Sequence, residues 1–192
     1  MRKNDVLGLL EEHGALIFGH FELPSGLHSS AYFQTAAVLQ YPHVAQKIAK
    51  ALTSQFQSEP DLVVTPGTSS VILGQEVARI FKCRAIFTEK EQEVMRFGRN
   101  FKINRGERVL IIEDVLTTGQ RIAEAAALAQ AYGAKIVGVG VIIDRSTQKP
   151  PFALPIRSLV SYPLEVWPPD SCPQCLSGTP LTGKGLKSGG PS

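Results

Sequence analysis

The sequence contains few of the features that mark several classes of protein. Only three of its 192 residues are cysteine, so at least one thiol has no partner within the chain. No apolar run reaches transmembrane length, and the first residues lead into no signal-peptide core. The net charge of +3 comes without a long Lys/Arg block, so composition gives no argument for nucleic acid. We therefore expect a cytoplasmic protein that binds neither nucleic acid nor membrane and is compatible with a small anionic substrate.

The three cysteines support different interpretations. Cys83 lies in an apolar helical pattern and is expected to be a buried small side chain. Cys172 and Cys175 form a single CxxC pair, which could be half of a zinc site shared across a dimer. A zinc site needs about four ligands, and the chain has no second such pair. We favour a structural knuckle or solvent-exposed thiols.

The chain does contain enough apolar residues for one domain. Hydrophobic residues make up 43% of the sequence, which argues against a disordered chain. The most informative stretch is 109–121, where four aliphatic residues run into Glu113 and Asp114 and then into a Thr-Thr-Gly turn. An apolar run this short, bounded by turn chemistry, indicates a strand buried on both faces. Hydroxyls and backbone N–H groups at the start of the following helix suit a phosphate.

Strands and helices alternate along the rest of the chain. The pattern predicts helices at 5–13, from Pro42, after Ser70 and at 121–132, and strands at 61–65, 85–87, 109–112, 135–143 and 158–162. This alternation predicts a mostly parallel sheet with helices on both faces. The turns that follow its strands should meet at one edge. The long charged segment 89–107 is expected to be a functional or mobile loop.

The two ends of the chain differ from this core. Strand candidates at 15–18 and 31–34, joined by a Pro-Ser-Gly turn, predict a hairpin within a small N-terminal hood of about residues 1–40. His20 and His28 are expected to be turn or hood residues without a catalytic role. The core should cover about 41–165 of a single domain spanning 1–180. Residues 181–192, rich in Gly, Ser and Lys, are expected to form a disordered tail.

These motifs together resemble those of a known enzyme family. The segment Glu113 to Gly119 is similar to the ribose-phosphate signature of type I phosphoribosyltransferases. The hood sequence, the strand end Asp144-Arg145 and the terminal CxxC resemble the orotate branch of that family. The resemblance implies the type I phosphoribosyltransferase fold, an α/β architecture. It also implies transfer of ribose 5-phosphate from 5-phosphoribosyl 1-diphosphate to orotate, with Mg²⁺, in a homodimer whose mobile loops complete the partner's sites.

The resemblance also implies roles for individual residues. Catalysis would involve Lys90, Glu113 and Asp114, with Mg²⁺ held through the two acids and substrate rather than by a dedicated metal site. Orotate would be bound by Thr117, Arg145, Tyr32 and Phe33, although one of the two aromatics is expected to be core. Phosphoribosyl diphosphate would contact Glu113, Asp114, Val115, Leu116, Thr117, Thr118, Gly119, Gln120, Arg121, Thr68, Ser69, Lys90, Arg96 and Arg99.

Several positions depart from the family pattern. Pro24 and Glu89 stand where many orotate enzymes carry cations, and Gln120 follows the phosphate turn where small residues are usual. Two alternatives therefore remain open: a phosphoribosyltransferase for another nucleobase, and a non-catalytic paralogue that binds ribose phosphates.

Overall fold

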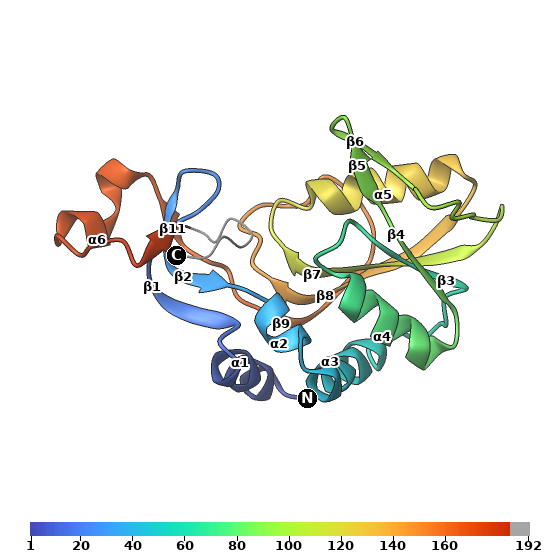
Figure 1. Ribbon diagram of the computed structural model, residues 1–192, viewed down its shortest axis with the longest axis horizontal. Coiled ribbons are helices and arrows are strands. Elements are labelled where there is room, and N and C mark those ends of the chain that lie inside the picture. The colour runs from blue at the N-terminus through green and yellow to red at the C-terminus, as the bar shows by residue number, and fades with distance from the viewer. Residues whose placement is uncertain (185–192) are drawn as a thin grey trace.

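The computed structural model describes residues 1–184, in which a central parallel sheet stands beside a smaller sheet (Figure 1). The central sheet has the strand order β4-β3-β7-β8-β9, and every neighbouring pair in it is parallel. Its strands are β3 (Leu62–Thr65), β4 (Arg84–Phe87), β7 (Arg108–Leu116), β8 (Lys135–Asp144) and β9 (Ile156–Ser161). The predicted parallel α/β architecture is confirmed.

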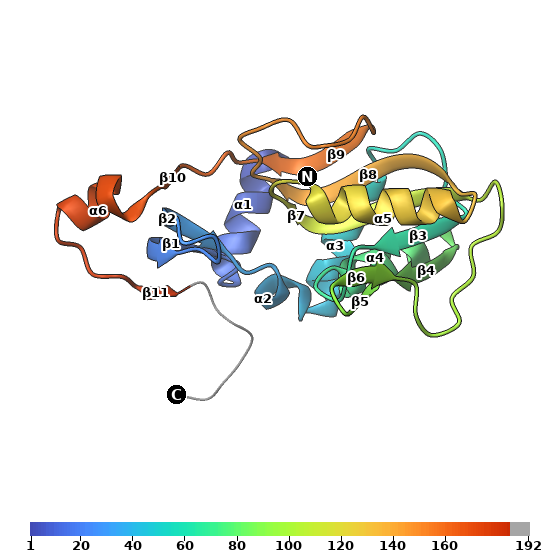
Figure 2. The same ribbon diagram turned by 90° about the horizontal axis from the view of Figure 1, so that it is seen from above.

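Helices cover both faces of the central sheet (Figure 2). They are α3 (Pro42–Thr53) and α4 (Val71–Phe81) on one face and α5 (Gln120–Ala131) on the other. Alternate residues of β7 explain this arrangement, because Leu110 and Ile112 pack toward α3 and α4 whereas Val109 and Ile111 pack toward α5. The central strand is therefore buried on both faces, as its unbroken aliphatic run predicts.

The smaller sheet has the strand order β10-β2-β1-β11 and is called the hood sheet below. It joins the N-terminal hairpin to segments from the end of the chain, and α1 (Lys3–Glu12) contacts both β1 of this sheet and β9 of the central sheet (Figure 2). Its strands are β1 (Leu16–Glu22), β2 (His28–Phe33), β10 (Val166–Trp167) and β11 (Gly183–Lys184). The short elements η1 (Pro169–Ser171) and α6 (Pro173–Leu176) lie between β10 and β11 in the chain, whereas α2 (Ala36–Leu39) follows β2 and packs against α3.

The predicted hairpin is confirmed, and its turn has a clear physical basis. Gly26 has φ 79°, a left-handed conformation that glycine adopts without steric cost. The Leu23 amide donates to the Leu27 carbonyl at 2.7 Å, which closes the turn. The first strand is longer than expected, since it continues to Glu22 rather than ending near Phe18.

Three expectations need correction or qualification. Cys83 does not lie in a helix, because α4 ends at Phe81 and Lys82 adopts a left-handed conformation with φ 54°. The charged segment 89–107 contains a hairpin of β5 (Glu89–Glu91) and β6 (Val94–Arg96). Its turn residues Gln92 and Glu93 have positive φ without being glycine or asparagine, so the usual hairpin signal was missing. In the expected tail, β11 pairs with β1, and residues 185–192 lie outside the described part.

The strand order creates a reversal point between β3 and β7. From β3 the chain adds β4 on one side, and it then adds β7, β8 and β9 on the other. Open α/β sheets bind ligands at the carboxyl ends of the strands where the order reverses in this way. Among residues 1–184, no helix is both long enough and apolar enough to cross a bilayer.

Candidate active site

A cleft of about 430 Å³ opens at the carboxyl end of β7, between the central sheet and the hood sheet. It is lined by Leu23, Pro24, Tyr32, Phe33, Gln34, Thr35, Ala36, Ser69, Arg145 and every residue from Glu113 to Ile122. The strand end, the bend that follows it, the end of β8 and the hood hairpin thus meet at one place. The convergence of turns at one edge of the sheet, expected from the sequence, is found here.

Glu113 is the more deeply buried of the two acids at the end of β7. Its side chain is 4% exposed, and the Arg121 guanidinium lies 3.7 Å from its carboxylate. Burial, reinforced by the neighbouring Asp114 charge, raises the pKa of Glu113 from its ordinary 4.5 to about 8, although Arg121 opposes the shift. Glu113 is therefore mostly protonated at neutral pH in the ligand-free protein. A cation or a polarised ribose hydroxyl in the cleft would favour its ionised form.

Asp114 is held by hydrogen bonds on both carboxylate oxygens. The Val115 amide donates to Oδ1 at 3.0 Å, and the Thr35 hydroxyl donates to Oδ2. Thr35 precedes α2, so this bond ties the acid to the segment that leaves the hood. Thr35 could not be predicted from the sequence, because no local motif links it to a strand 79 positions later.

The bend after β7 leaves its backbone donors unused. Gly119 has φ 79° and precedes the first residue of α5, while the Gln120 amide donates to the Thr118 hydroxyl at 3.4 Å. Within residues 1–184, the backbone N–H groups of Thr117, Thr118 and Gly119 donate to no protein acceptor. Free N–H groups at a helix N-terminus form a favourable environment for an anion.

Arg145 contributes positive charge to the cleft. Its amide donates to the Leu116 carbonyl at 3.0 Å, which places it beside the end of β7. The neighbouring Asp144 carboxylate accepts instead from the Ser146 amide and hydroxyl, at 3.0 and 2.6 Å. Burial lowers the pKa of Arg145, and the Tyr32 side chain opposes that shift. In the described chain Arg145 forms no ion pair, so its guanidinium remains available to an anionic ligand.

Tyr32 and Phe33 differ in their surroundings although both line the cleft. Phe33 is 7% exposed and packs edge-on against Tyr162, with ring centroids 5.5 Å apart. Tyr32 is half-buried and lies 5.8 Å from the Phe21 ring. Phe33 is thus part of the hydrophobic core, and Tyr32 is the aromatic with more surface available to a ligand.

A second cleft of about 300 Å³ adjoins the first. It is lined by Pro66, Gly67, Thr68, Thr88, Glu89, Lys90, Met95 and Arg121. Arg121 lines both clefts, since its guanidinium donates to the Pro66 carbonyl and lies 3.5 Å from the Ser69 hydroxyl. Arg121 thereby links the loop after β3 to Glu113 at the end of β7, and Lys90 lines the same second cleft.

The loop cations Arg96 and Arg99 line neither of these clefts. Arg99 pairs with Glu89 at 3.0 Å and Arg96 pairs with Glu91 at 3.4 Å, and the Lys90 ammonium contacts Glu93 at 3.1 Å. All three pairs are exposed, and exposed ion pairs contribute little stability. These contacts would therefore not prevent the hairpin cations from turning toward an anionic ligand.

Comparison with known proteins identifies the family. Residues 34–168 match the phosphoribosyl transferase domain family. The orotate phosphoribosyltransferase of Caldicellulosiruptor saccharolyticus is 40% identical over 188 residues, which cover 97% of this chain and 98% of that protein. That of Thermus thermophilus is also 40% identical, over 92% of this chain and 98% of the relative.

A solved structure shares the fold of this chain. The crystal structure of orotate phosphoribosyltransferase from Aeropyrum pernix superimposes with a TM-score of 0.70 at 20% identity, over 81% of this chain and 93% of that one. At this identity the likeness establishes the fold, while the sequence relatives establish the branch. The chain belongs to the phosphoribosyltransferase family, in the branch of the orotate phosphoribosyltransferases.

Proposed function

We propose that this protein transfers the ribose 5-phosphate group from 5-phosphoribosyl 1-diphosphate to orotate, releasing pyrophosphate and orotidine 5′-phosphate. One observation carries the proposal: a single cleft holds the acids of β7, a bend whose amides donate to no acceptor among residues 1–184, and an arginine that forms no ion pair with those residues. These groups match the three parts of the reacting system, which are a ribose with hydroxyls, a phosphate and a base bearing a carboxylate.

The bend after β7 is proposed to bind the 5′-phosphate. The amides of Thr117, Thr118 and Gly119 have no acceptor among residues 1–184, and the α5 N-terminus adds a favourable dipole. Val115, Leu116, Gln120 and Arg121 complete the segment that lines the cleft. The carboxylates of Glu113 and Asp114 would then accept hydrogen bonds from the ribose hydroxyls.

Mg²⁺ is proposed to bind at the same acids together with substrate oxygens. The donor set fits, because Mg²⁺ prefers oxygen ligands and usually keeps several waters while using one or two carboxylates. Burial, and after it the neighbouring Asp114 charge, raises the pKa of Glu113, so a divalent cation beside the two acids would favour the ionised form. When bound, the ion would neutralise charge on the diphosphate, while Asp114, oriented by Thr35, holds the ribose.

Orotate is proposed to bind between Arg145 and the hood. The Arg145 guanidinium matches the two oxygens of a carboxylate, and it lacks a protein partner in the described chain. Tyr32 would contact one face of the base, with Phe33 supporting it from the core, and Thr117 would contact its polar edge. Burial of Arg145 strengthens its preference for an anion, because a desolvated charge gains more from a partner.

The second cleft is proposed to receive the pyrophosphate. Thr68 lines this cleft, Ser69 lies beside it, and Lys90 and Arg121 supply positive charge. We further propose a homodimer in which the hairpin β5–β6 and the loop after it reach the partner's cleft, so that Lys90, Arg96 and Arg99 complete that site. The exposure of this hairpin and its weak local ion pairs support such a movement.

The proposed reaction needs no protein nucleophile. A ring nitrogen of orotate forms a bond to the anomeric carbon of ribose as the bond from that carbon to the pyrophosphate oxygen breaks, and the proton of that ring N–H passes to solvent or to the departing pyrophosphate. The protein positions both reactants and compensates charge on the leaving group, which are the effects that this site offers. Closing the cleft would exclude water that could hydrolyse the activated ribose. The cytoplasm is the compartment that we expect for this reaction.

The test is a direct assay with purified protein. Orotate, phosphoribosyl diphosphate and Mg²⁺ are mixed with the protein, and loss of orotate absorbance is measured together with pyrophosphate release. The amount of orotate consumed should equal the amount of pyrophosphate released. The Asp114→Asn variant should catalyse both changes much more slowly. If orotate persists at high protein concentration, a panel of purines and uracil tests for another base. Binding of phosphoribosyl diphosphate without turnover of any base would favour the non-catalytic alternative.

A further inference from the structure

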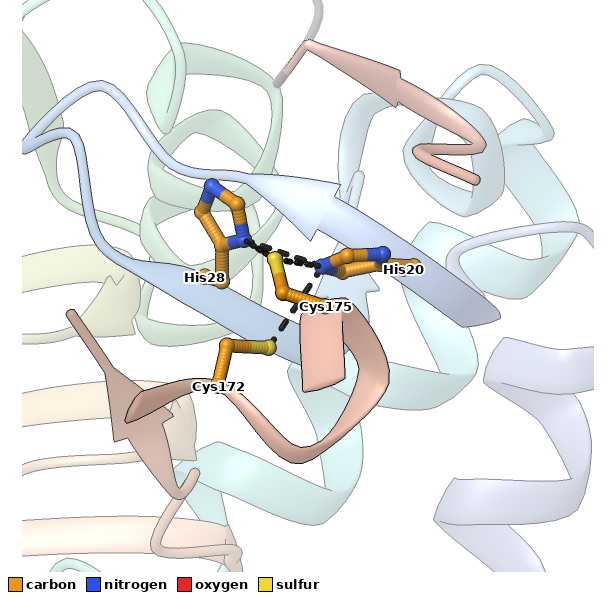
Figure 3. A group of neighbouring side chains, drawn as sticks. All are labelled: His20, His28, Cys172 and Cys175. Carbon is orange, nitrogen blue, oxygen red and sulfur yellow. Dashed lines mark hydrogen bonds between the residues drawn. The ribbon is translucent and has the colours of Figure 1, made fainter. Parts of the chain in front are cut away.

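Four metal-binding side chains converge on the outer side of the hood sheet (Figure 3). His20 comes from β1 and His28 from β2, while Cys172 directly precedes α6 and Cys175 lies within it. One ligand atom from each residue lies within 4.8 Å of every other. His20, His28 and Cys172 are almost fully buried, with exposures of 2%, 6% and 0%. The expectation of solvent-exposed thiols is therefore wrong for Cys172.

The distances within the cluster resemble those of a tetrahedral zinc site. Cys172 Sγ lies 3.4 Å from His20 Nε2, and Cys175 Sγ lies 3.6 Å from His20 Nε2 and 3.2 Å from His28 Nδ1. Zinc bond lengths place sulfur and nitrogen ligands about 3.6 Å apart and two nitrogens about 3.3 Å apart. The two histidine nitrogens are 2.9 Å apart, so only a small separation would admit the ion.

A hydrogen bond outside the cluster fixes the state of His20. Its Nδ1 lies 2.8 Å from the Thr179 carbonyl oxygen, which can only accept, so Nδ1 carries the proton. In the neutral ring Nε2 then carries the lone pair, and it faces into the cluster toward both sulfurs and His28. Histidines that bind metals usually donate their other ring N–H to such a carbonyl, because this fixes the tautomer and the ring orientation.

We propose that His20, His28, Cys172 and Cys175 bind one Zn²⁺ as a structural site. Two histidines and two cysteines in tetrahedral arrangement, with no position left for substrate, are the ligand set of structural zinc. Binding would release one proton from each thiol and leave both imidazoles neutral, so that two thiolates balance the charge of the ion. His20 and His28 of the hood would thus supply the two ligands that the CxxC pair lacks, within the same chain.

The site would fasten the C-terminal segment to the hood. Trp167 of β10 pairs with His28, and the Thr182 hydroxyl accepts from the His20 amide at 3.0 Å. The C-terminal segment therefore contacts the hood hairpin both before Cys172 and after Cys175. The same hairpin carries Tyr32 and Phe33 into the active-site cleft. Zinc would therefore stabilise the wall of the cleft without contacting substrate.

Metal content and spectroscopy test this proposal independently of catalysis. The wild type, incubated with excess Zn²⁺ and passed through gel filtration, should retain about one zinc per chain by mass spectrometry of the metal. Replacing zinc by Co²⁺ should give the intense visible bands of tetrahedral cobalt and a thiolate-to-cobalt charge-transfer band. A chelator should lower Tm and change the fluorescence of Trp167, the single tryptophan, which lies beside His28.

Matched variants identify the ligands. Cys175→Ser and His28→Asn should lose at least about nine-tenths of the bound zinc, because each removes one of the four ligands. Cys83→Ser and His43→Asn alter a cysteine and a histidine outside the cluster, so these variants should retain the bound zinc. If Cys175→Ser fails to fold, the cobalt spectrum of the wild type still decides the question.

Three results would overturn the proposal. They are zinc below about a tenth of an ion per wild-type chain, an octahedral cobalt spectrum, and equal zinc content in the Cys175 and Cys83 variants. A thiol titration separates zinc from a disulfide between Cys172 and Cys175. Chelator alone should expose two further reactive thiols if zinc is bound, whereas only a reductant would expose them if a disulfide had formed.

Discussion

Replacing Glu113 by glutamine should stabilise the ligand-free protein, and increasingly so as pH rises. Glu113 is buried beside Asp114, and its pKa is raised to about 8 from the ordinary 4.5. Between these values the folded state binds the proton more tightly than the unfolded state, so Glu113 makes folding less favourable as pH rises. Relative to its value at high pH, the free energy of unfolding gains the full contribution of protonated Glu113 below pH 4.5. That contribution is lost as pH rises through about 8. Glutamine keeps a neutral side chain of similar shape at every pH.

The expected size follows from the two pKa values. The two pKa values differ by about 3.5, and each unit of difference corresponds to about 1.4 kcal/mol. The free energy of unfolding should therefore fall by on the order of 5 kcal/mol once Glu113 has fully ionised. The Glu113→Gln variant should therefore differ little from wild type at pH 5, and it should be more stable by several kcal/mol at pH 9. Urea unfolding at a fixed protein concentration, followed by Trp167 fluorescence, gives both free energies.

A matched variant separates this effect from general changes in charge. Glu12→Gln removes an exposed carboxyl from the surface of α1, and its difference from wild type should not change appreciably over the same pH range. The reasoning would be refuted if the Glu113→Gln difference were constant with pH or became smaller above pH 7. Such a result would mean that Glu113 is ionised in the folded protein despite its burial.

Three other predictions concern the reaction. Asp114→Asn should lower kcat/KM by at least about 10-fold with an unchanged circular dichroism spectrum, because one charged hydrogen bond to ribose is lost; unchanged kinetics would contradict the assigned role. Arg145→Gln should raise KM for orotate by about 10-fold to 100-fold, whereas Arg157→Gln, at an exposed position of β9, should leave KM unchanged. Equal effects of the two substitutions would show that Arg145 does not bind orotate. Lys90→Ala and Asp114→Asn proteins, each almost inactive, should regain about a quarter of wild-type activity when they are mixed in equal amounts and their subunits exchange. About half of the dimers are then mixed, and each mixed dimer has one intact site if the hairpin is shared. No recovery despite exchange would place the hairpin in its own subunit's site.

The part of the site predicted from sequence is the part encoded in consecutive residues. The aliphatic run, the acids and the bend from Val109 to Arg121 lie next to one another in the chain, so hydrophobic pattern and turn chemistry predict both their structure and their position. Asp144-Arg145 was placed at the same sheet edge for the same reason, since it ends a parallel strand. Local sequence reasoning succeeds where strand order and handedness follow from alternating elements.

The residues that were missed act across long sequence separations. Thr35 contacts Asp114 across 79 positions, and His20 contacts Cys172 across 152 positions. Spacing within the sequence cannot reveal a ligand set that is assembled by strand pairing in the hood sheet. The β5–β6 hairpin was missed for another reason, since Gln92 and Glu93 adopt left-handed conformations that their residue types rarely adopt.

The central claim is that the bend after β7 binds the phosphate of a phosphorylated sugar. Gly119 and Gly106 test it as a pair, because both have positive φ, at 79° and 85°. A Cβ at Gly119 would lie 2.9 Å from atoms of Phe152 and Pro150, whereas a Cβ at Gly106 would meet nothing within 4 Å. Both substitutions strain the backbone similarly, but only Gly119→Ala should displace the bend.

The decisive measurement is calorimetric titration of the three proteins with phosphoribosyl diphosphate and Mg²⁺. Wild type and Gly106→Ala should bind one molecule per chain with similar affinity, and Gly119→Ala should bind at least about 10-fold more weakly, a difference of about 1.4 kcal/mol. Equal affinity in all three proteins, or no binding to the wild type, would contradict the account.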